Sequence, residues 1–189
     1  MAFLLFTGGI ITLTDARAGA VLDAYLDIET TGLCRYTGDV TVVGVYLCDG
    51  RGNESVVQLV GYDITALNLR EVLAEARSIY TYNGRRFDLP FLHTYVGLDL
   101  AALYHHHDLM YDCWKYRLYG GFKVVESRLG IFRELRGIDG LQAVGLWWRY
   151  VQDGDLDALD LLLRYNREDV VNLKALREKL MLLDCGGMR

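Results

Sequence analysis

Two carboxylates closely follow an apolar run near the start of the chain, within residues 25–32, whose sequence is YLDIETTG. If residues 21–28 form a strand, alternate side chains point to the same face, so Asp27 and Glu29 leave the same side of a sheet. Burying two like charges is unfavourable unless cations neutralise them. Oxygen-only ligand sets suit Mg²⁺ or Mn²⁺. The stretch therefore predicts a divalent-metal site at the end of a strand, with further acidic ligands supplied later in the chain.

Later acidic residues occur in two suitable places. Asp88 ends the sequence NGRRFD and precedes Leu89-Pro90, a pattern typical of a helix start with Asp88 at or near the N-cap. Tyr165 and Asp169 are four residues apart in a long helical pattern, so they project from one helix face. On spacing alone this pair is also compatible with an ordinary helix surface, and Asp27 and Glu29 with a surface acid and a turn cap.

Hydrophobic periodicity predicts strands in the first half of the chain and helices in the second. With 189 residues, a single proline and no linker-like tract, the sequence predicts one domain spanning 1–189. A strand, a helix and a strand in succession favour a parallel crossover in one mixed sheet. Residues 1–19 are unassigned, with an extra edge strand as one possibility. The predicted strands are residues 20–28, 39–48, 55–60, 78–82 and 103–109, and the predicted helices are residues 65–76, 88–96, 111–116, 124–129, 141–151 and 156–183.

The acidic residues follow a recognisable order. Asp27-Ile28-Glu29, then Asn83 with Phe87-Asp88, then Tyr165-x-x-x-Asp169 resemble the three motifs of the DEDD (DnaQ-like) 3′ to 5′ exonuclease superfamily. The sister variant of this superfamily carries histidine five residues before the last aspartate, where this chain has arginine, so the tyrosine (DEDDy) variant is the better match. Residues 122–172 resemble in particular the YprB-like ribonuclease-H-like branch. The resemblance extends over residues 20–183.

The resemblance implies an α/β fold of the ribonuclease-H-like type, with a central mixed sheet of about five strands and helices on both faces. It also implies a hydrolase that removes nucleotides from nucleic-acid 3′ ends by a two-metal-ion mechanism. Asp27 would bridge two divalent cations, Mg²⁺ or Mn²⁺, flanked by Glu29, Asp88 and Asp169. Tyr165 would orient the attacking water, because its ordinary pKa near 10 makes it a poor base.

Five further residues lie beside the expected metal ligands and are candidates for substrate binding: Thr30, Asn83, Arg85, Arg86 and Phe87. The two arginines are suited to binding phosphates, and solvated loop arginines are an equally good interpretation. Asn83 either contacts substrate or stabilises a turn with Gly84, and the turn is slightly favoured.

Charge and composition restrict the partners. The net charge of −5 disfavours a broad basic nucleic-acid-binding face, but removing four metal ligands from the 25 acidic residues brings them close to the 20 basic ones. No stretch approaches the roughly 20 apolar residues of a membrane span. Four separated cysteines favour reduced thiols in the cytoplasm.

The sequence thus favours nucleic acid as the partner, with a single-stranded 3′ end of DNA or RNA as the expected substrate. Two alternatives stay open. One is a structure-specific endonuclease or RNA-trimming nuclease, and the other is a catalytically idle module that binds nucleic acid or protein. The choice between DNA and RNA, the pathway served and the oligomeric state are not determined by the sequence.

Overall fold

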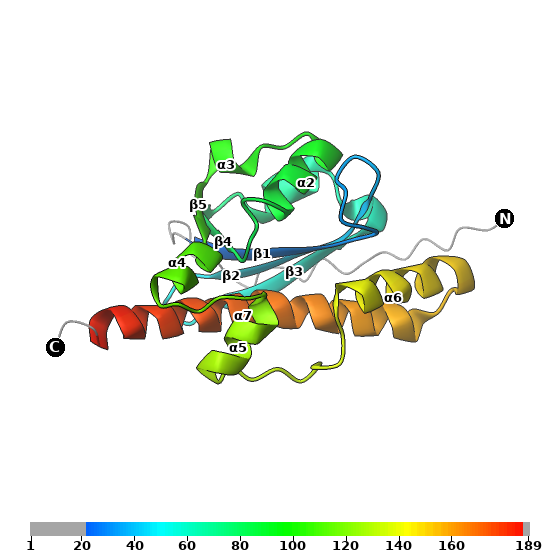
Figure 1. Cartoon of the computed structure of the whole chain (residues 1–189). Coiled ribbons are helices and arrows are strands. Elements are labelled where there is room, and N and C mark those ends of the chain that lie inside the picture. Colours follow the sequence, from blue (N-terminus) through cyan, green and yellow to red (C-terminus); the bar gives the residue numbers. More distant parts are fainter. Residues whose placement is uncertain (1–21, 187–189) are drawn as a thin grey trace.

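The computed structural model describes residues 22–186, and these form a five-stranded mixed sheet with helices on both faces (Figure 1). The predicted α/β architecture is therefore confirmed. The first two residues of the expected first strand and the possible edge strand before residue 20 lie outside the described residues. The strands are β1 (Leu22–Thr30), β2 (Val40–Cys48), β3 (Glu54–Val60), β4 (Ala76–Thr81) and β5 (His105–Asp108).

The order of strands in the sheet is β3-β2-β1-β4-β5, so β1 is central. Antiparallel pairs join β1 to β2 and β2 to β3, whereas β4 lies parallel to β1 and β5 parallel to β4. The parallel crossover from the hairpin to β4 passes through a helix, as the sequence predicted. The carboxyl ends of β1 and β4 therefore lie at the same edge of the sheet.

The helices divide between the two faces of the sheet. Leu69, Leu92 and Leu100, from the first three α-helices, pack in one hydrophobic cluster, whereas Cys113, Leu146 and Leu173, from later helices, belong to the clusters on the opposite face. None of the described helices carries an apolar segment long enough to span a bilayer. The α-helices are α1 (Ala66–Val72), α2 (Asp88–Val96), α3 (Leu100–Leu103), α4 (Leu109–Lys115), α5 (Phe122–Leu129), α6 (Gly140–Asp153) and α7 (Leu156–Gly186), with a 3-10 turn at Gly61–Asp63.

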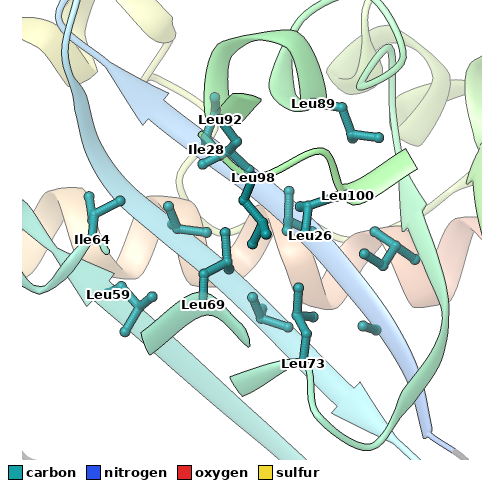
Figure 2. Packing of buried hydrophobic residues seen from close by; sticks show 14 of the residues in the cluster. Leu26, Ile28, Leu59, Ile64, Leu69, Leu73, Leu89, Leu92, Leu98 and Leu100 are labelled. Atoms are coloured by element: carbon teal, nitrogen blue, oxygen red, sulfur yellow. The ribbon is translucent and has the colours of Figure 1, made fainter. Parts of the chain in front are cut away.

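Residues 22–28 of β1 alternate between the two faces of the sheet. The even-numbered residues of this range, including Leu26 and Ile28, belong to the cluster that also contains residues of α1, α2 and α3 (Figure 2). Tyr25, an odd-numbered residue, instead packs with Leu173 of α7. Because the side chains of a strand alternate with period two, Asp27 and Glu29 face α7. The two acids share one face, as predicted, because the residues that alternate with them are apolar and are buried in the hydrophobic cluster on the other face.

Several predicted boundaries differ from the observed ones by one or two residues, and two predicted elements differ in a way that the sheet explains. The helix expected to reach residue 76 ends at Val72, because Ala76 already pairs with Leu22 in the sheet. The strand expected over residues 103–109 is limited to His105–Asp108, the residues that pair with β4. Leu103 instead ends α3, a short helix that the sequence pattern did not reveal. In both cases pairing between distant strands overrides a local apolar pattern.

Candidate active site

Three carboxylates from two distant segments meet where β1 ends. Asp27 and Glu29 extend from β1 toward α7, and Asp169 extends from the side of α7 that packs on the sheet. One carboxylate oxygen from each of the three lies within 4.8 Å of the others. Glu29 and Asp169 are buried and Asp27 is partly buried. An all-oxygen donor set of this kind fits a hard divalent cation such as Mg²⁺ or Mn²⁺.

Asp88 lies beside this cluster, at the helix start where the sequence predicted it. It is the first residue of α2, and its side chain does not cap the helix, whose N-cap is Phe87 without a side-chain hydrogen bond. Instead, Asp88 Oδ1 accepts a hydrogen bond of 3.2 Å from the backbone N–H of Ile28. The helix start predicted at Asp88 is therefore confirmed, but its side chain accepts from the backbone of β1 instead of capping the helix. This bond links the start of α2 to the acid-bearing strand.

Burial and mutual repulsion raise the pKa of every acid in the group. Burial, and then the neighbouring carboxylates, raise the pKa values of Asp27 and Glu29 well above the ordinary range. Burial raises the pKa of Asp88 to about 7. It raises that of Asp169 to about 6, against the opposing effect of Arg133. Ionising the whole group at neutral pH is unfavourable without added positive charge, which is the electrostatic property expected of a metal centre.

An amide network holds Asp27 from the side of α7. Asn166 is fully buried and its Nδ2 donates to both the backbone oxygen and Oδ2 of Asp27, at 3.3 Å each. Gln58 Nε2 in turn donates to Asn166 Oδ1 at 2.9 Å. The amide fits only because β2 carries Gly44 opposite Asp27, since a Cβ at that position would lie 2.1 Å from Asn166 Oδ1. Close contact between sheet and helix thus fixes the orientation of Asp27.

Tyr165 lies one helical turn before Asp169 and is 6% exposed. Burial, and then the charges of Asp169, Glu29 and Asp27, raise the pKa of its hydroxyl far above the ordinary value, so the hydroxyl stays protonated. Lys123 of α5 places its Nζ 4.4 Å from the centre of the Tyr165 ring and donates to the backbone oxygen of Ile138. The tyrosine is therefore available as a hydrogen-bond donor next to the acids and not as a base.

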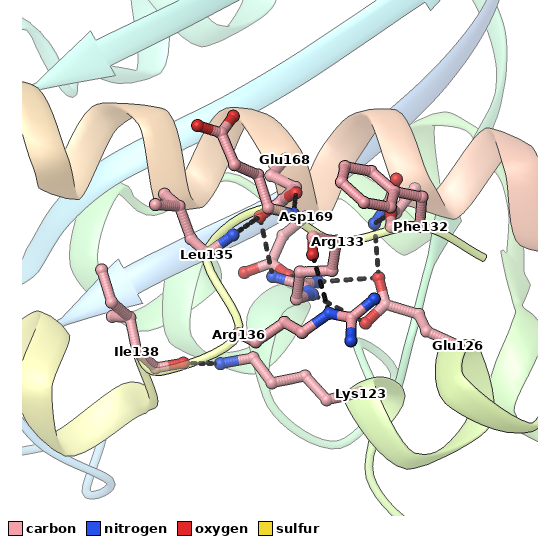
Figure 3. A network of polar contacts seen from close by, with 11 residues as sticks. Lys123, Glu126, Phe132, Arg133, Leu135, Arg136, Ile138, Glu168 and Asp169 are labelled. Carbon is pink, nitrogen blue, oxygen red and sulfur yellow. Dashed lines mark hydrogen bonds and ion pairs between the residues drawn. The ribbon is translucent and has the colours of Figure 1, made fainter. Parts of the chain in front are cut away.

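A buried ionic network lies on the other side of Asp169 (Figure 3). The guanidinium of Arg133 forms a two-point ion pair with Glu126, at 2.7 and 2.8 Å, and also contacts Asp169 Oδ1. Asn172 Nδ2 donates to Glu126 at 2.7 Å. Glu168 accepts hydrogen bonds from the backbone N–H groups of Glu134 and Leu135. The loop between α5 and α6 is thereby tied to the face of α7 that carries Asp169.

The candidate substrate-binding residues surround the turn between β4 and α2 and the end of β1. Asn83 has a left-handed backbone with φ of 64°, and its carbonyl accepts from two later N–H groups, which confirms its expected turn role. Asp108 accepts hydrogen bonds from the backbone N–H groups of Asn83 and Arg85 and so fixes this turn. The side chain of Arg85 is exposed. Thr30 donates from its hydroxyl to the carbonyl of Gly32.

A surface hollow of about 210 Å³ is lined in part by Arg86 and Phe87, which precede Asp88 in the chain. Phe87 and Phe91 contribute two rings whose centres are 5.3 Å apart. Arg35 and the exposed Tyr36, from the loop after β1, stack on each other and also line the hollow. Aromatic and arginine side chains together are suited to bases and phosphates. The hollow is lined by Leu33, Cys34, Arg35, Tyr36, Arg86, Phe87 and Phe91.

Sequence reasoning missed four residues of this site: Lys123, Glu126, Arg133 and Asn166. Asn166 directly follows Tyr165, but adjacent helical residues point in different directions, so spacing gave no reason to select it. Arg133 lies in a loop without periodicity, and only its position after the apolar pair Ile131-Phe132 hinted at burial.

Solved structures support the assignment of the fold. The family B DNA polymerase of the archaeon Pyrobaculum calidifontis matches 85% of this chain with a TM-score of 0.63 and 21% identity, and this chain spans only 24% of the polymerase. NrnC of Brucella melitensis, in a structure with pGG, matches 87% of this chain and 74% of its own length, with a TM-score of 0.57 and 22% identity. A structure described as the apo form of a nuclease matches 88% of this chain and 75% of its own, with a TM-score of 0.54 and 23% identity.

Comparison of the sequence with known families assigns the chain to a superfamily. Among curated proteins, none matches the chain. A family model described as the RNase_H superfamily matches residues 24–181, which include most of β1, most of α7 and everything between them. The matched range contains the three acids that meet at the end of β1, and Asp88 beside them. The chain belongs to the RNase_H superfamily.

Proposed function

We propose that this protein is a 3′ to 5′ exonuclease of the DEDDy type, YprB-like branch, that hydrolyses phosphodiester bonds with two divalent cations, Mg²⁺ or Mn²⁺. The single observation that carries the proposal is the meeting of Asp27, Glu29 and Asp169 oxygens within 4.8 Å, next to the buried Asp88. Clustered buried carboxylates are costly to keep in a protein that does not bind cations. An active nuclease therefore accounts for them better than an idle binding module.

The metal ligands in this proposal are Asp27, Glu29, Asp88 and Asp169. When bound at such a centre, divalent ions stabilise the charge of the phosphoryl group and lower the pKa of water to supply the nucleophile. Asp27 is suited to a shared position, because it lies on the central strand and is oriented by Asn166. Oδ1 of Asp88 accepts from the Ile28 N–H, and in this proposal Oδ2 binds the metal.

Tyr165 holds and orients the attacking water in this proposal. Its hydroxyl remains protonated because burial and the nearby acids raise its pKa. A protonated phenol donates a hydrogen bond, whereas a phenolate would add a further negative charge to an already anionic site. Lys123 over the tyrosine ring partly offsets that negative charge.

The substrate in this proposal is a nucleic acid that presents a single-stranded 3′ end. Arg86 and Phe87 line the hollow and directly precede Asp88 in the chain, so we place the terminal nucleotide in the hollow. Thr30, Asn83 and Arg85 lie at the adjoining ends of β1 and β4. Stacking on aromatic rings is tolerant of sequence, which suits an enzyme that removes successive nucleotides. The described cysteines are unpaired, in keeping with the cytoplasm that we propose as its compartment.

The test is cleavage of 5′-labelled oligonucleotides, as matched single- and double-stranded DNA and RNA, in Mg²⁺, Mn²⁺ or EDTA. We expect a ladder that shortens from the 3′ end with either metal and no cleavage in EDTA. The Asp169→Asn protein, purified in parallel, controls for contaminating nucleases. A single internal cut would replace this proposal with a structure-specific endonuclease, and binding without metal-dependent cleavage would replace it with an idle binding module.

A further inference from the structure

The site contains a buried ion pair that the proposed chemistry does not use. Glu126 is 2% exposed and Arg133 is 5% exposed, and each charge is removed from water. Isolated buried ion pairs contribute little net stability, because the loss of hydration cancels most of their attraction. The position of the pair, against a candidate metal ligand, suggests a role beyond stabilising the fold.

The pair is rigidly held. Arg133 Nε and Nη2 donate to the two oxygens of Glu126, which fixes the plane of the guanidinium. Glu126 is held in addition by Asn172 Nδ2, which also donates to the carbonyl of Phe132 at 3.1 Å. Asn172 extends from α7, the helix that also carries Asp169. Asn172 and Asp169, both on α7, thus contact the two members of the same ion pair.

One nitrogen of this guanidinium reaches the candidate metal centre. Arg133 Nη2, already bonded to Glu126, also contacts Asp169 Oδ1 (Figure 3). This contact occupies Oδ1 of Asp169 and fixes the orientation of the carboxylate. The second oxygen, Oδ2, is not engaged by Arg133. Since a carboxylate rotates freely unless it is held, this contact selects which way Asp169 faces.

Arg133 does not face the substrate. Its Nη1 is buried, lies 3.7 Å from Glu168 Oε2 and has no hydrogen-bond partner among the described residues. A nitrogen enclosed in this way is inaccessible to a phosphate of the substrate. Arg133 can therefore act on the reaction only through Asp169.

The charge of the pair also matters. A lone guanidinium beside Asp169 would repel a divalent cation, but Glu126 cancels that positive charge at hydrogen-bond distance. The pair thus supplies a strong donor to Asp169 while adding no net charge to the centre. An uncharged donor at that place would form a weaker hydrogen bond to the carboxylate.

We propose that Arg133, held and neutralised by Glu126, is a positioning residue that orients Asp169 for binding of the divalent cation. This inference rests on the proposed metal centre. Its measurable consequence is metal affinity in the absence of nucleic acid, which a purely structural role for the pair would not change.

The test is a titration of the metal-free protein with Mn²⁺, in which isothermal titration calorimetry measures the binding affinity. The double variant Glu126→Gln with Arg133→Met removes both charges and so keeps the net charge of the centre. We expect it to bind Mn²⁺ about 10- to 100-fold more weakly than the wild type, the usual effect of losing a group that orients a metal ligand. Arg133→Lys should also weaken binding, because an ammonium group lacks the planar fork that engages two carboxylates at once.

Two further variants complete the experiment. Arg177→Met removes the ion pair between Arg177 of α7 and Asp23. Arg177 lies about two helical turns from Asp169, so this variant should leave the Mn²⁺ affinity unchanged. Asp169→Asn should abolish binding at this site. Thermal unfolding in EDTA establishes that each variant is folded, and Arg133→Lys serves as the deciding variant if the double variant is not.

The outcomes separate the two proposals. If Asp169→Asn loses Mn²⁺ binding but the folded pair variants bind as tightly as the wild type, the positioning role is wrong and the metal centre stands. If Asp169→Asn binds Mn²⁺ as the wild type does, or the wild type binds none, the metal centre fails and this inference fails with it.

Discussion

Asn166 can approach Asp27 closely because residue 44 has no side chain. Exchange of Gly44 for alanine therefore tests whether Asn166 orients Asp27. Gly44 lies directly opposite Asp27 in the antiparallel pair of β1 and β2. A Cβ at this position would lie 2.1 Å from Oδ1, 2.9 Å from Cγ and 3.1 Å from Nδ2 of Asn166. Ordinary contact distances exceed the first value by more than ~1 Å. The fully buried Asn166 must therefore shift, and we expect this shift to disturb its hydrogen bonds to Asp27.

The expected cost follows from two effects. Overpacking a close-packed interior costs about 1 to 3 kcal/mol. Each hydrogen bond that the displaced amide loses, to Asp27 or to Gln58, costs about 0.5 to 1.5 kcal/mol. Replacing a strand glycine recovers roughly 0.5 to 1 kcal/mol of chain entropy. We expect Gly44→Ala to lower the free energy of unfolding by about 2 to 4 kcal/mol, and the melting temperature by roughly 5 to 15 °C.

The assay combines thermal unfolding in EDTA with Mn²⁺ titration. Mn²⁺ affinity should fall about 10- to 100-fold in Gly44→Ala, because Asp27 loses the donor that orients it. Gly145→Ala is the matched control: no other group lies within 4 Å of a Cβ there, and the position is inside α6. Alanine in a helix interior is favoured over glycine by about 1 kcal/mol, so this variant should melt at a higher temperature.

A double variant decides whether the Asn166 contact is the cause. If the clash accounts for the loss, adding Asn166→Ala to Gly44→Ala should cost much less than Asn166→Ala costs alone, with a coupling of about 1 kcal/mol or more. Strict additivity of the two free-energy changes would refute the reasoning, as would an unchanged melting temperature for Gly44→Ala.

Three further predictions concern the acids and the arginines. Asp27→Asn and Asp169→Asn should each lower the Mn²⁺-dependent nuclease rate by about 10³-fold, since metal-assisted stabilisation is worth several kcal/mol; wild-type rates in both variants would remove these residues from the reaction. In EDTA, the melting temperature should fall as the pH rises from about 5 to about 8, because burial raises the pKa of Asp88 to about 7 and of Asp169 to about 6, so the folded protein holds protons that the unfolded chain has released; a flat or rising profile contradicts this. Exchange of both Arg85 and Arg86 for alanine should raise KM for an oligonucleotide roughly tenfold with little change in kcat, as expected when charged hydrogen bonds to phosphate are lost, and an unchanged KM would exclude both residues from substrate binding.

The sequence predicted those parts of the structure that depend on local patterns. The alternation along β1, the turn at Asn83 and the long α7 follow from periodicity and turn chemistry, and all three are observed. Asp27 and Glu29 could be selected as a like-charged pair at the end of an apolar strand, whereas Asp88 and Asp169 lie on helices and were selected because they complete motifs that resemble a known family. Their arrival at one place required only that β1, α2 and α7 pack in the usual way for the fold.

The groups that hold the acids could not be predicted, because their positions depend on contacts between distant segments. Asn166 reaches Asp27 only through the register that sets Gly44 opposite that residue. Arg133 reaches Asp169 from a loop whose path no periodicity describes. The interaction of Asp88 with the Ile28 N–H likewise depends on where α2 packs relative to β1. Sequence patterns identify ligand chemistry more readily than they identify the groups that orient ligands.

The charge balance of the site argues for external cations. The two networks that orient the acids add no net charge, since Gln58 and Asn166 are neutral and Arg133 is cancelled by Glu126. A further cation near the acids is Lys123, and burial lowers the pKa of its ammonium group. A binding module that had lost catalysis would be stabilised by matching its buried acids with its own cations. This chain instead supplies donors that orient the carboxylates and leave the group with excess negative charge when it is ionised, an arrangement that suits the binding of divalent ions.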